Sequence, residues 1–298
     1  MTLPTRQDRA WLAGVLGVPA DRLRLRRLDG GITSSVHAIW APDALGEPRQ
    51  YVLRRWTECD PTADMGDVDR EASILTGLET TELPAPHLIA ADAAPEYCSA
   101  PSLLMTRVPG SPQLTPKDTE SWLRQMAEML PRIHAAPVEA PPLTLDHKEE
   151  HLRVPRWASD PGLWAAALEL FGTPQPGGER CFIHSDYQQF NVLWTGAKLS
   201  GVVDWPWGSH GSPDVDVAHC RLNLTVLYSA EHASRFLSFY EHAAGRRVDP
   251  WWDVAGLLLY LPGWGDFLQR QAGRRLTVDF AGMHARMEQT MRQALART

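Results

Sequence analysis

Short apolar runs separated by turn residues fill the first third of the chain and predict a β-rich region with one helix. The expected strands cover residues 23–28, 36–40, 51–56, 87–91 and 102–107. Between the third and fourth strands, apolar residues recur near the helical period over residues 67–78, which predicts a helix there. Pro109, Gly110 and Pro112 then end this pattern abruptly.

The rest of the chain shows mostly helical periodicity. Helices are expected at residues 121–135, 157–171, 225–244, 251–271 and 278–297. Pro131 lies inside the first of these and should bend that helix or end its regular part, because its ring clashes with the preceding turn. We therefore expect an α+β fold with two lobes, a β-rich N-terminal lobe of residues 1–108 and a larger helical C-terminal lobe of residues 109–298.

One segment of the helical region, residues 181–205, breaks its pattern. Apolar strands at residues 192–194 and 199–203 flank a tight polar turn, which predicts a β-hairpin. Asp186 and Asn191 precede this hairpin, and Asp204 ends it. Because a hairpin brings its two ends together, we expect Asn191 and Asp204 to be neighbours in space.

These polar residues suit phosphoryl transfer. Its transition state is loose, so the protein mainly positions the acceptor hydroxyl and neutralises phosphate charge. Mg²⁺ prefers hard oxygen ligands together with phosphate oxygens and water, and Asn191 and Asp204 offer an amide oxygen and a carboxylate. Asp186, five residues before Asn191, could accept the proton of the hydroxyl without serving as a metal ligand.

Bulk composition excludes several classes of protein. The 298 residues carry a net charge of −7, which disfavours a nucleic-acid partner because nucleic-acid binding needs a basic excess. The spacing of the four cysteines fits neither a zinc site nor a disulfide framework. The N-terminus lacks the apolar core of a signal peptide, and the longest apolar stretch, residues 254–261, is too short for a bilayer. We expect a cytoplasmic protein with reduced thiols and no membrane partner, and its oligomeric state stays open.

The motif His184-x-Asp186-x-x-x-x-Asn191, followed about a dozen residues later by Asp204, resembles the catalytic and metal loops of the aminoglycoside-phosphotransferase and choline-kinase family, relatives of the protein kinases. The resemblance implies a protein-kinase-like fold. It also implies that Asp186 is the catalytic base, that His184 braces its loop, and that Asn191 and Asp204 bind Mg²⁺. The family commonly has glycine where this chain has Ser185.

The N-terminal region is similar to the nucleotide-binding elements of the same family. Arg54 takes the place of the phosphate-binding lysine, and Glu71 matches the acid that pairs with that cation. Residues 103–110 resemble the strand and hinge whose backbone receives adenine. The resemblance implies ATP as the nucleotide, with GTP as the alternative. The implied nucleotide-binding residues are Gly30, Gly31, Thr33, Ser34, Ser35, Arg54, Glu71, Met105, Arg107 and Val108.

Ser212 and Pro213 predict the start of a further helix, with acidic residues in its first turn. Asp216 in that turn resembles a family residue that ties the metal loop to the helix, and we expect it to be structural. His210 and His219 are not spaced with any cysteine or a second histidine as a set of metal ligands.

Charge counts bear on the substrate, which should be a small molecule with a hydroxyl group. Residues 1–112 hold 15 acids against 11 bases, and residues 113–298 hold 21 against 18. A polycationic aminoglycoside should meet a strongly acidic helical lobe, so a less charged sugar, macrolide, amino alcohol or small metabolite is at least as well supported. The tryptophans expected to line a substrate cleft are Trp207, Trp251, Trp252 and Trp264.

Three functions are open at this point. The first is a small-molecule kinase that transfers the γ-phosphoryl group of ATP with Mg²⁺. The second is a degenerate kinase fold that only binds nucleotide, motivated by Ser185 and by Arg54, whose planar fork is not a point-charge ammonium. The third is a protein kinase, disfavoured because no activation segment ending like Ala-Pro-Glu follows Asp204. Taken singly, Arg54 and Glu71 could also be solvated surface charges.

Overall fold

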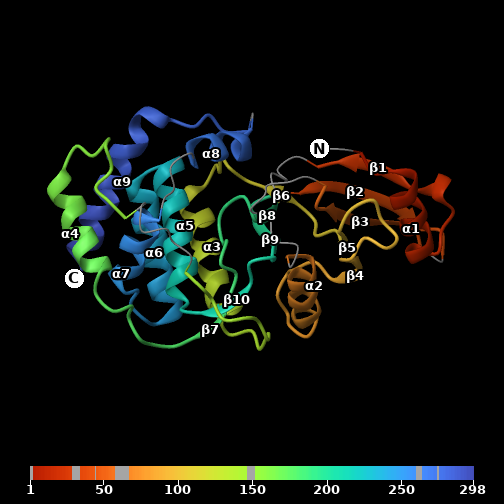
Figure 1. Cartoon of the computed structure of the whole chain (residues 1–298), viewed down its shortest axis with the longest axis horizontal. Coiled ribbons are helices and arrows are strands. Elements are labelled where there is room, and N and C mark those ends of the chain that lie inside the picture. The colour runs from red at the N-terminus through yellow and green to blue at the C-terminus, as the bar shows by residue number, and fades with distance from the viewer. Residues whose placement is uncertain are drawn as a thin grey trace. The chain divides into compact units, whose positions relative to one another are not determined.

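The computed structural model describes residues 3–28, 34–43, 45–57, 67–145, 152–259, 264–273 and 275–298, with the backbone alone at residues 67 and 264–267. The chain divides into two compact units. Unit 1 comprises Met1–Pro109 and Ser200–Trp207, and unit 2 comprises Gly110–Leu199 and Gly208–Thr298. Figure 1 labels the elements of both, and each unit is described by itself.

Unit 1 is built on an antiparallel sheet with strand order β1-β2-β3-β5-β4 (Figure 1). Its elements are α1 (Arg6–Leu16), η1 (Ala20–Arg22), β1 (Arg24–Arg27), β2 (Ser35–Pro42), β3 (Pro48–Arg55), α2 (Asp67–Leu78), β4 (Leu88–Asp92) and β5 (Ser102–Thr106). The five predicted strands and the predicted helix over residues 67–78 are confirmed. Helix α1 was not predicted.

Helix α1 is defined at both ends by side-chain and backbone caps. Thr5 and Asp8 form a capping box at its start, and Gly17 ends it in the left-handed conformation at φ 65°. Its Leu12 packs with Leu53 in the hydrophobic core of unit 1. This local signal was readable from the sequence, because Thr5 and Asp8 have capping-box spacing.

A buried ion pair also ties α1 to the sheet. Asp8 Oδ2 lies 2.8 Å from Arg55 Nη1, and both side chains are almost fully buried. The Ser99 N–H donates to Asp8 Oδ1 at 2.7 Å. Burial raises the pKa of Asp8, but the hydrogen bonds from Ser99 and Thr5 and the charge of Arg55 outweigh it, so the pKa is lowered. Asp8 is therefore ionised in the folded protein at neutral pH.

Unit 2 is mostly helical. Its elements are β6 (Ser111–Pro112), α3 (Thr119–His134), α4 (Pro161–Phe171), β7 (Cys181–Ile183), β8 (Val192–Thr195), β9 (Lys198–Val202), β10 (Ser209–Gly211), α5 (Asp214–Leu227), α6 (Ala230–Ala244), α7 (Pro250–Leu258), α8 (Trp264–Ala272) and α9 (Phe280–Leu295). The chain passes from unit 2 into unit 1 along β9. The described helices include none long and apolar enough to cross a membrane.

Two predicted helices are wrong in extent. The helix expected at residues 225–244 is two helices, because Ser229 is extended and caps α6 by accepting from the His232 N–H. The helix expected at residues 251–271 is α7 and α8, and the sequence between them contains Pro262 and Gly263, which disfavour a continuous helix. By contrast, α3 continues through Pro131 to His134.

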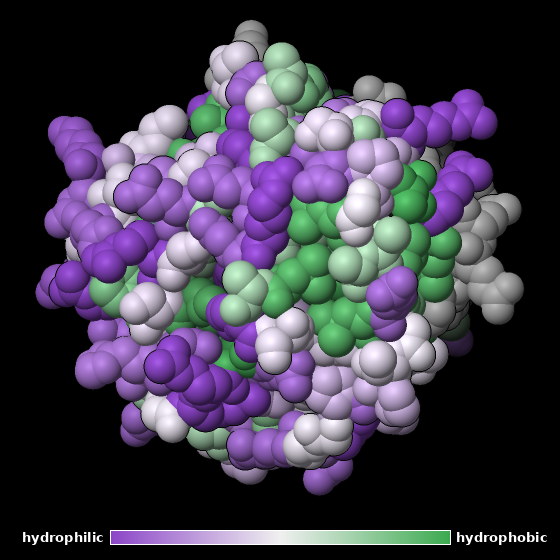
Figure 2. Space-filling model, turned by 90° about the vertical axis from the view of Figure 1, so that its left-hand side faces the viewer, coloured by the Kyte–Doolittle hydropathy of each residue, from purple (hydrophilic) through white to green (hydrophobic). Residues whose placement is uncertain are grey.

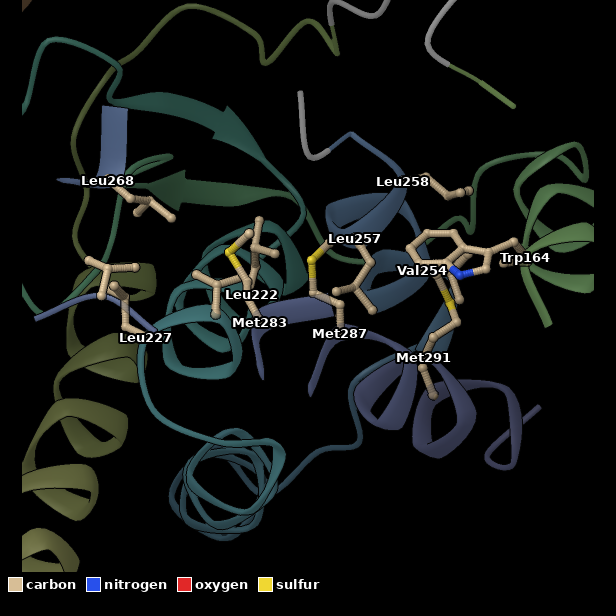
Figure 3. Close-up of a cluster of buried hydrophobic side chains, with 14 of the residues drawn as sticks. Trp164, Leu222, Leu227, Val254, Leu257, Leu258, Leu268, Met283, Met287 and Met291 are labelled. Atoms are coloured by element: carbon tan, nitrogen blue, oxygen red, sulfur yellow. The ribbon is translucent and has the colours of Figure 1, made fainter. Parts of the chain in front are cut away.

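Helix α5 packs against α6, α7 and α9, and twelve of its fourteen residues are buried. Figure 3 shows the cluster of leucine, methionine and tryptophan side chains that joins α4, α5, α7, α8 and α9. Each fully buried side chain of this kind contributes about 1.5–3 kcal/mol. The side of the molecule on which α4 and α9 lie in Figure 1 carries hydrophobic patches between hydrophilic residues (Figure 2).

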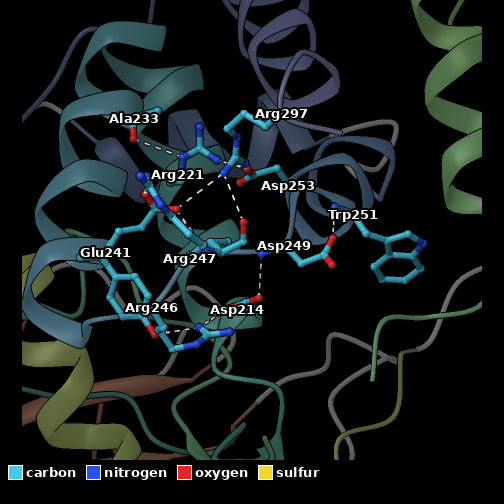
Figure 4. A network of polar contacts seen from close by, with 12 residues as sticks. Asp214, Arg221, Ala233, Glu241, Arg246, Arg247, Asp249, Trp251, Asp253 and Arg297 are labelled. Carbon is cyan, nitrogen blue, oxygen red and sulfur yellow. Dashed lines mark hydrogen bonds and ion pairs between the residues drawn. The ribbon is translucent and has the colours of Figure 1, made fainter. Parts of the chain in front are cut away.

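A polar network crosses the same helices (Figure 4). Asp253 of α7 pairs with Arg221 of α5 and with Arg297 near the C-terminus. Arg221 Nε also donates to the Ala233 carbonyl of α6 at 3.2 Å. Because breaking one member would leave a buried charge without its partner, this network fixes α5 firmly within the bundle.

Candidate active site

The segment between β7 and β8 carries the predicted catalytic residues. It leaves β7 through Ser185, whose φ of 66° is left-handed. This conformation costs a residue other than glycine about 1–2 kcal/mol, which explains why glycine suits the position and why something must hold Ser185 there.

Asp216 of α5 holds this turn. Its carboxylate accepts the N–H groups of His184 at 2.8 Å and Ser185 at 2.7 Å, and His134 Nε2 lies 3.2 Å away. Burial raises the pKa of Asp216, but the hydrogen bond from His134 and the charges of His134 and His184 outweigh it, so the pKa is lowered. An ionised, fully buried carboxylate thus anchors the loop to α5.

His184 is fully buried, and its Nδ1 accepts the backbone N–H of Asp186 at 3.2 Å. Its ring also meets the Tyr187 ring edge-on, and the Tyr187 hydroxyl donates to the Met126 carbonyl of α3. The histidine therefore contacts its own loop, in a position suited to bracing it.

The carboxylate of Asp186 is held by three side chains. Oδ1 lies 2.8 Å from His219 Nε2 and accepts from Gln188 Nε2 at 2.6 Å. Oδ2 accepts from Asn191 Nδ2 at 2.9 Å. Burial raises the pKa of Asp186, but the hydrogen bond and charge of His219, followed by His184 and Gln188, outweigh it, so the pKa is lowered. The group is a positioned carboxylate with 23% of its side chain exposed.

Asn191 is almost fully buried, and its Nδ2 also donates to the Asp186 carbonyl at 2.9 Å. With Nδ2 engaged in this way, Oδ1 is the atom of the side chain that could bind a cation. Asn191 belongs to unit 2 and Asp204 to unit 1, so the expectation that they are neighbours stays a prediction.

Arg54 of β3 is the centre of a polar cluster in unit 1. Its Nη1 lies 3.0 and 2.9 Å from the two carboxylate oxygens of Glu71 and 2.7 Å from Asp204 Oδ1. Its Nε donates to Ser34 Oγ at 2.9 Å. Arg54 and Glu71 are buried, so the interpretation of both as solvated surface charges is wrong.

Electrostatics and backbone geometry mark this cluster as constrained. Burial raises the pKa of Glu71 to about 7, although Arg54 lowers it. The Trp205 N–H donates to Glu71 Oε1 at 3.3 Å. Asp204 has a left-handed φ of 72°, and 38% of its side chain is exposed. The cluster therefore presents an accessible carboxylate beside a buried cation.

Four of the other predicted nucleotide-binding residues lie in the described part of the chain, and three lie outside it. Ser35 is buried, and Met105 pairs with Val52 between β5 and β3. The backbone N–H of Arg107 donates to the Gln50 carbonyl at 3.1 Å. Val108 contacts Gly201, where an added Cβ would lie 2.2 Å from Val108 Cγ1. Outside the described residues lie Gly30, Gly31 and Thr33.

The four predicted substrate tryptophans differ in exposure. Trp207 is 45% exposed, and the Arg70 guanidinium lies 6.0 Å from its ring centroid. Trp251 and Trp252 are only 5% and 3% exposed and pack in a hydrophobic cluster, which favours a structural role. The side chain of Trp264 lies outside the described part of the chain.

His219, Gln188 and His134 are site residues that sequence reasoning missed, and His219 is the one that an α5 pattern could have indicated. His219 was considered only as a metal ligand, and it is not one of a described cluster of metal-binding side chains. A readable signal existed, because Asp216, His219 and Asn223 have i, i+3 and i+7 spacing and so share one face of α5.

Comparison with known proteins identifies the family and the fold of the chain. The profile of the phosphotransferase enzyme family APH matches residues 24–252. No curated protein matches the chain significantly. Among solved structures, the aminoglycoside phosphotransferase APH(4)-Ia has a TM-score of 0.64 at 17% identity, covering 96% of this chain and 98% of its own.

Two further structures share this kinase-like fold. Macrolide 2′-phosphotransferase MphH from Brachybacterium faecium has a TM-score of 0.57 at 16% identity, covering 96% and 97% of the two chains. Amicoumacin kinase hAmiN, in complex with AMP-PNP and Ca²⁺, has a TM-score of 0.61 at 14% identity, covering 97% and 93%. With most of its length matched by the family profile, the chain belongs to the phosphotransferase enzyme family.

Proposed function

We propose that this protein is a small-molecule kinase that transfers the γ-phosphoryl group of ATP to a substrate hydroxyl with Mg²⁺. The observation that carries the proposal is the ionised carboxylate of Asp186, which three side chains orient on a loop anchored by Asp216. Such positioning matters most in phosphoryl transfer, where the transition state demands little covalent chemistry from the protein.

Asp186 orients the acceptor hydroxyl and takes its proton. An ionised carboxylate has about four acceptor positions, two on each oxygen. His219 and Gln188 occupy Oδ1, whereas Asn191 occupies one position on Oδ2. The substrate hydroxyl therefore donates to Oδ2, which receives the proton as the oxygen attacks phosphorus. The lowered pKa of Asp186 makes it a weak base, so its contribution is mainly orientation.

Asn191 and Asp204 would hold the Mg²⁺. The amide oxygen of Asn191 and the partly exposed carboxylate of Asp204 are the hard oxygen donors that this ion takes, so the donor set fits. When bound, Mg²⁺ neutralises charge on the phosphates. Arg54 supplies a second, permanent positive charge, and Glu71 and Ser34 fix its direction.

Residues 1–108 form the nucleotide-binding lobe in this proposal, and residues 109–298 carry the catalytic loop. The end of β5 and the hinge that follows it, including Met105, Arg107 and Val108, offer backbone groups to the adenine. AMP-PNP and Ca²⁺ in the amicoumacin kinase structure support ATP and a divalent cation as ligands.

A weakly charged hydroxyl compound is the proposed acceptor. The acidic excess in residues 113–298 is three charges, too small to favour a polycation, and the half-exposed Trp207 offers aromatic surface for contact with a sugar-like ring. Structures similar to this chain include enzymes named for aminoglycosides and for macrolides, so both classes belong in a test panel.

A second candidate is a protein that binds nucleotide without turnover. The ion pair between Arg54 and Asp204 favours it, because a proposed metal ligand is already engaged by a cation.

One experiment separates the two functions. Purified protein is incubated with Mg²⁺, ATP and a panel of hydroxyl compounds, and ADP release is measured beside Asp186→Asn, which keeps the size of the side chain but removes its basicity. Turnover that falls at least about 100-fold in Asp186→Asn supports the kinase. ATP binding by calorimetry without any turnover supports the second candidate. Phosphorylation of added proteins, detected by mass spectrometry, would instead support a protein kinase.

A further inference from the structure

Helix α5 presents a polar face toward the catalytic loop. Asp216 binds the start of the loop, and His219, one turn further along, reaches the carboxylate of Asp186. His219 is one of only two half-buried residues of α5, and the other twelve residues of the helix are buried. An ionisable side chain in this position belongs to neither the metal-binding set nor the nucleotide-binding set described above.

We infer that His219 is a positioning residue that sets the orientation of the Asp186 carboxylate, an inference that rests on the proposed kinase function. Because Asp186 is a carboxylate that only accepts, the 2.8 Å contact requires a hydrogen on Nε2 of His219. This hydrogen bond fills Oδ1 together with Gln188 and leaves the open acceptor position on Oδ2.

His219 holds the Asp186 carboxylate from another element of the fold than Gln188 and Asn191 do. Those two residues lie on the same loop as Asp186, so their hydrogen bonds fix the carboxylate relative to that loop. His219 instead comes from α5, which the buried pair between Arg221 and Asp253 holds in the helical bundle. Its hydrogen bond therefore fixes the carboxylate relative to the body of unit 2.

Asn223, on the next turn of α5, packs beside the ring of His219. Its buried side chain donates from Nδ2 to the His219 carbonyl at 3.0 Å. Nδ2 also lies 3.2 Å from Nε2, but Nε2 gives its hydrogen to Asp186, so this is a packing contact between two donors and not a hydrogen bond.

The test uses His219→Ala and His219→Gln in the full-length protein. Glutamine places an N–H donor near the position of Nε2, whereas alanine removes it. Since the acceptor is unidentified, the reaction measured is Mg²⁺-dependent ATP hydrolysis, with water in place of the hydroxyl. The control is His232→Ala, which removes a half-buried histidine that bonds to Ser229 at the start of α6.

For His219→Ala we expect a kcat about 10- to 100-fold lower, with the KM for ATP within about twofold of wild type, because orientation rather than nucleotide binding is lost. His219→Gln should recover most of the kcat, and His232→Ala should keep it. Wild-type kcat in His219→Ala overturns the inference while the kinase function stands. A His219→Gln variant no more active than His219→Ala also overturns it. A wild-type protein that turns over ATP with neither water nor any compound of the hydroxyl panel overturns the proposed function itself.

Discussion

Replacing Asp216 with alanine removes the anchor of the catalytic loop. Two backbone N–H groups, those of His184 and Ser185, would lose an ionised acceptor at 2.8 and 2.7 Å. Each buried donor left without a partner costs about 1–3 kcal/mol, so Asp216→Ala should lower the free energy of unfolding by about 2–6 kcal/mol. That is a large part of the roughly 5–15 kcal/mol typical of a folded domain.

Urea unfolding measures this loss, with the fluorescence of the 12 tryptophans and circular dichroism as the two probes of the transition. Asp279→Ala is the matched control. Asp279 also accepts a backbone N–H, that of Gly282, but its side chain is 61% exposed, so its removal should cost only about 0.5–2 kcal/mol. A loss below about 1 kcal/mol for Asp216→Ala would refute the argument, because the two N–H groups would then have found other partners or water.

Three further variants test other parts of the structure. Arg54→Met should lower ATP turnover at least about tenfold in steady-state kinetics, whereas Arg54→Lys keeps a positive charge and should lose less of this turnover. Equal losses of turnover in the two variants would contradict the proposed role of the charge. Gly201→Ala should destabilise unit 1 by about 1–3 kcal/mol in thermal melts, since its Cβ would lie 2.2 Å from Val108 Cγ1, and Val108→Ala in the same chain should restore part of the loss. The lowered pKa of Asp8 means that its pairing with Arg55 stabilises the fold above the ordinary pKa of 3.8 and is lost as the pH falls through the folded-state value. Asp8→Asn should therefore melt earlier than wild type at pH 7, but its melting temperature should fall less on acidification below about pH 4; parallel pH profiles would exclude this linkage.

Local signals in the sequence were enough for much of the fold. The strands of unit 1 and helix α2 follow from alternation and helical periodicity, because each of these elements has one face that must be buried. Helical periodicity predicted the wrong extent of a helix where an apolar pattern continues across the boundary between two helices. Residues 225–244 look like one helix because both sides of Ser229 are apolar at helical spacing, but Ser229 caps a new helix and so ends that pattern.

By itself, the sequence determined the two-part α+β organisation and the spacing of Asp186, Asn191 and Asp204, because hydrophobic period and motif spacing are properties of neighbouring residues. The tertiary structure alone decided the partners of these groups. His219 meets Asp186 across 33 residues, and Arg54 meets Asp204 across 150, and packing rather than local preference brings such side chains together. Burial and the partners that packing supplies in turn decide their charge states: burial raises the pKa of Glu71 to about 7, whereas the hydrogen bond from His134 outweighs burial and lowers the pKa of Asp216. Which side chains position the catalytic carboxylate is therefore a consequence of how α5 packs in the bundle.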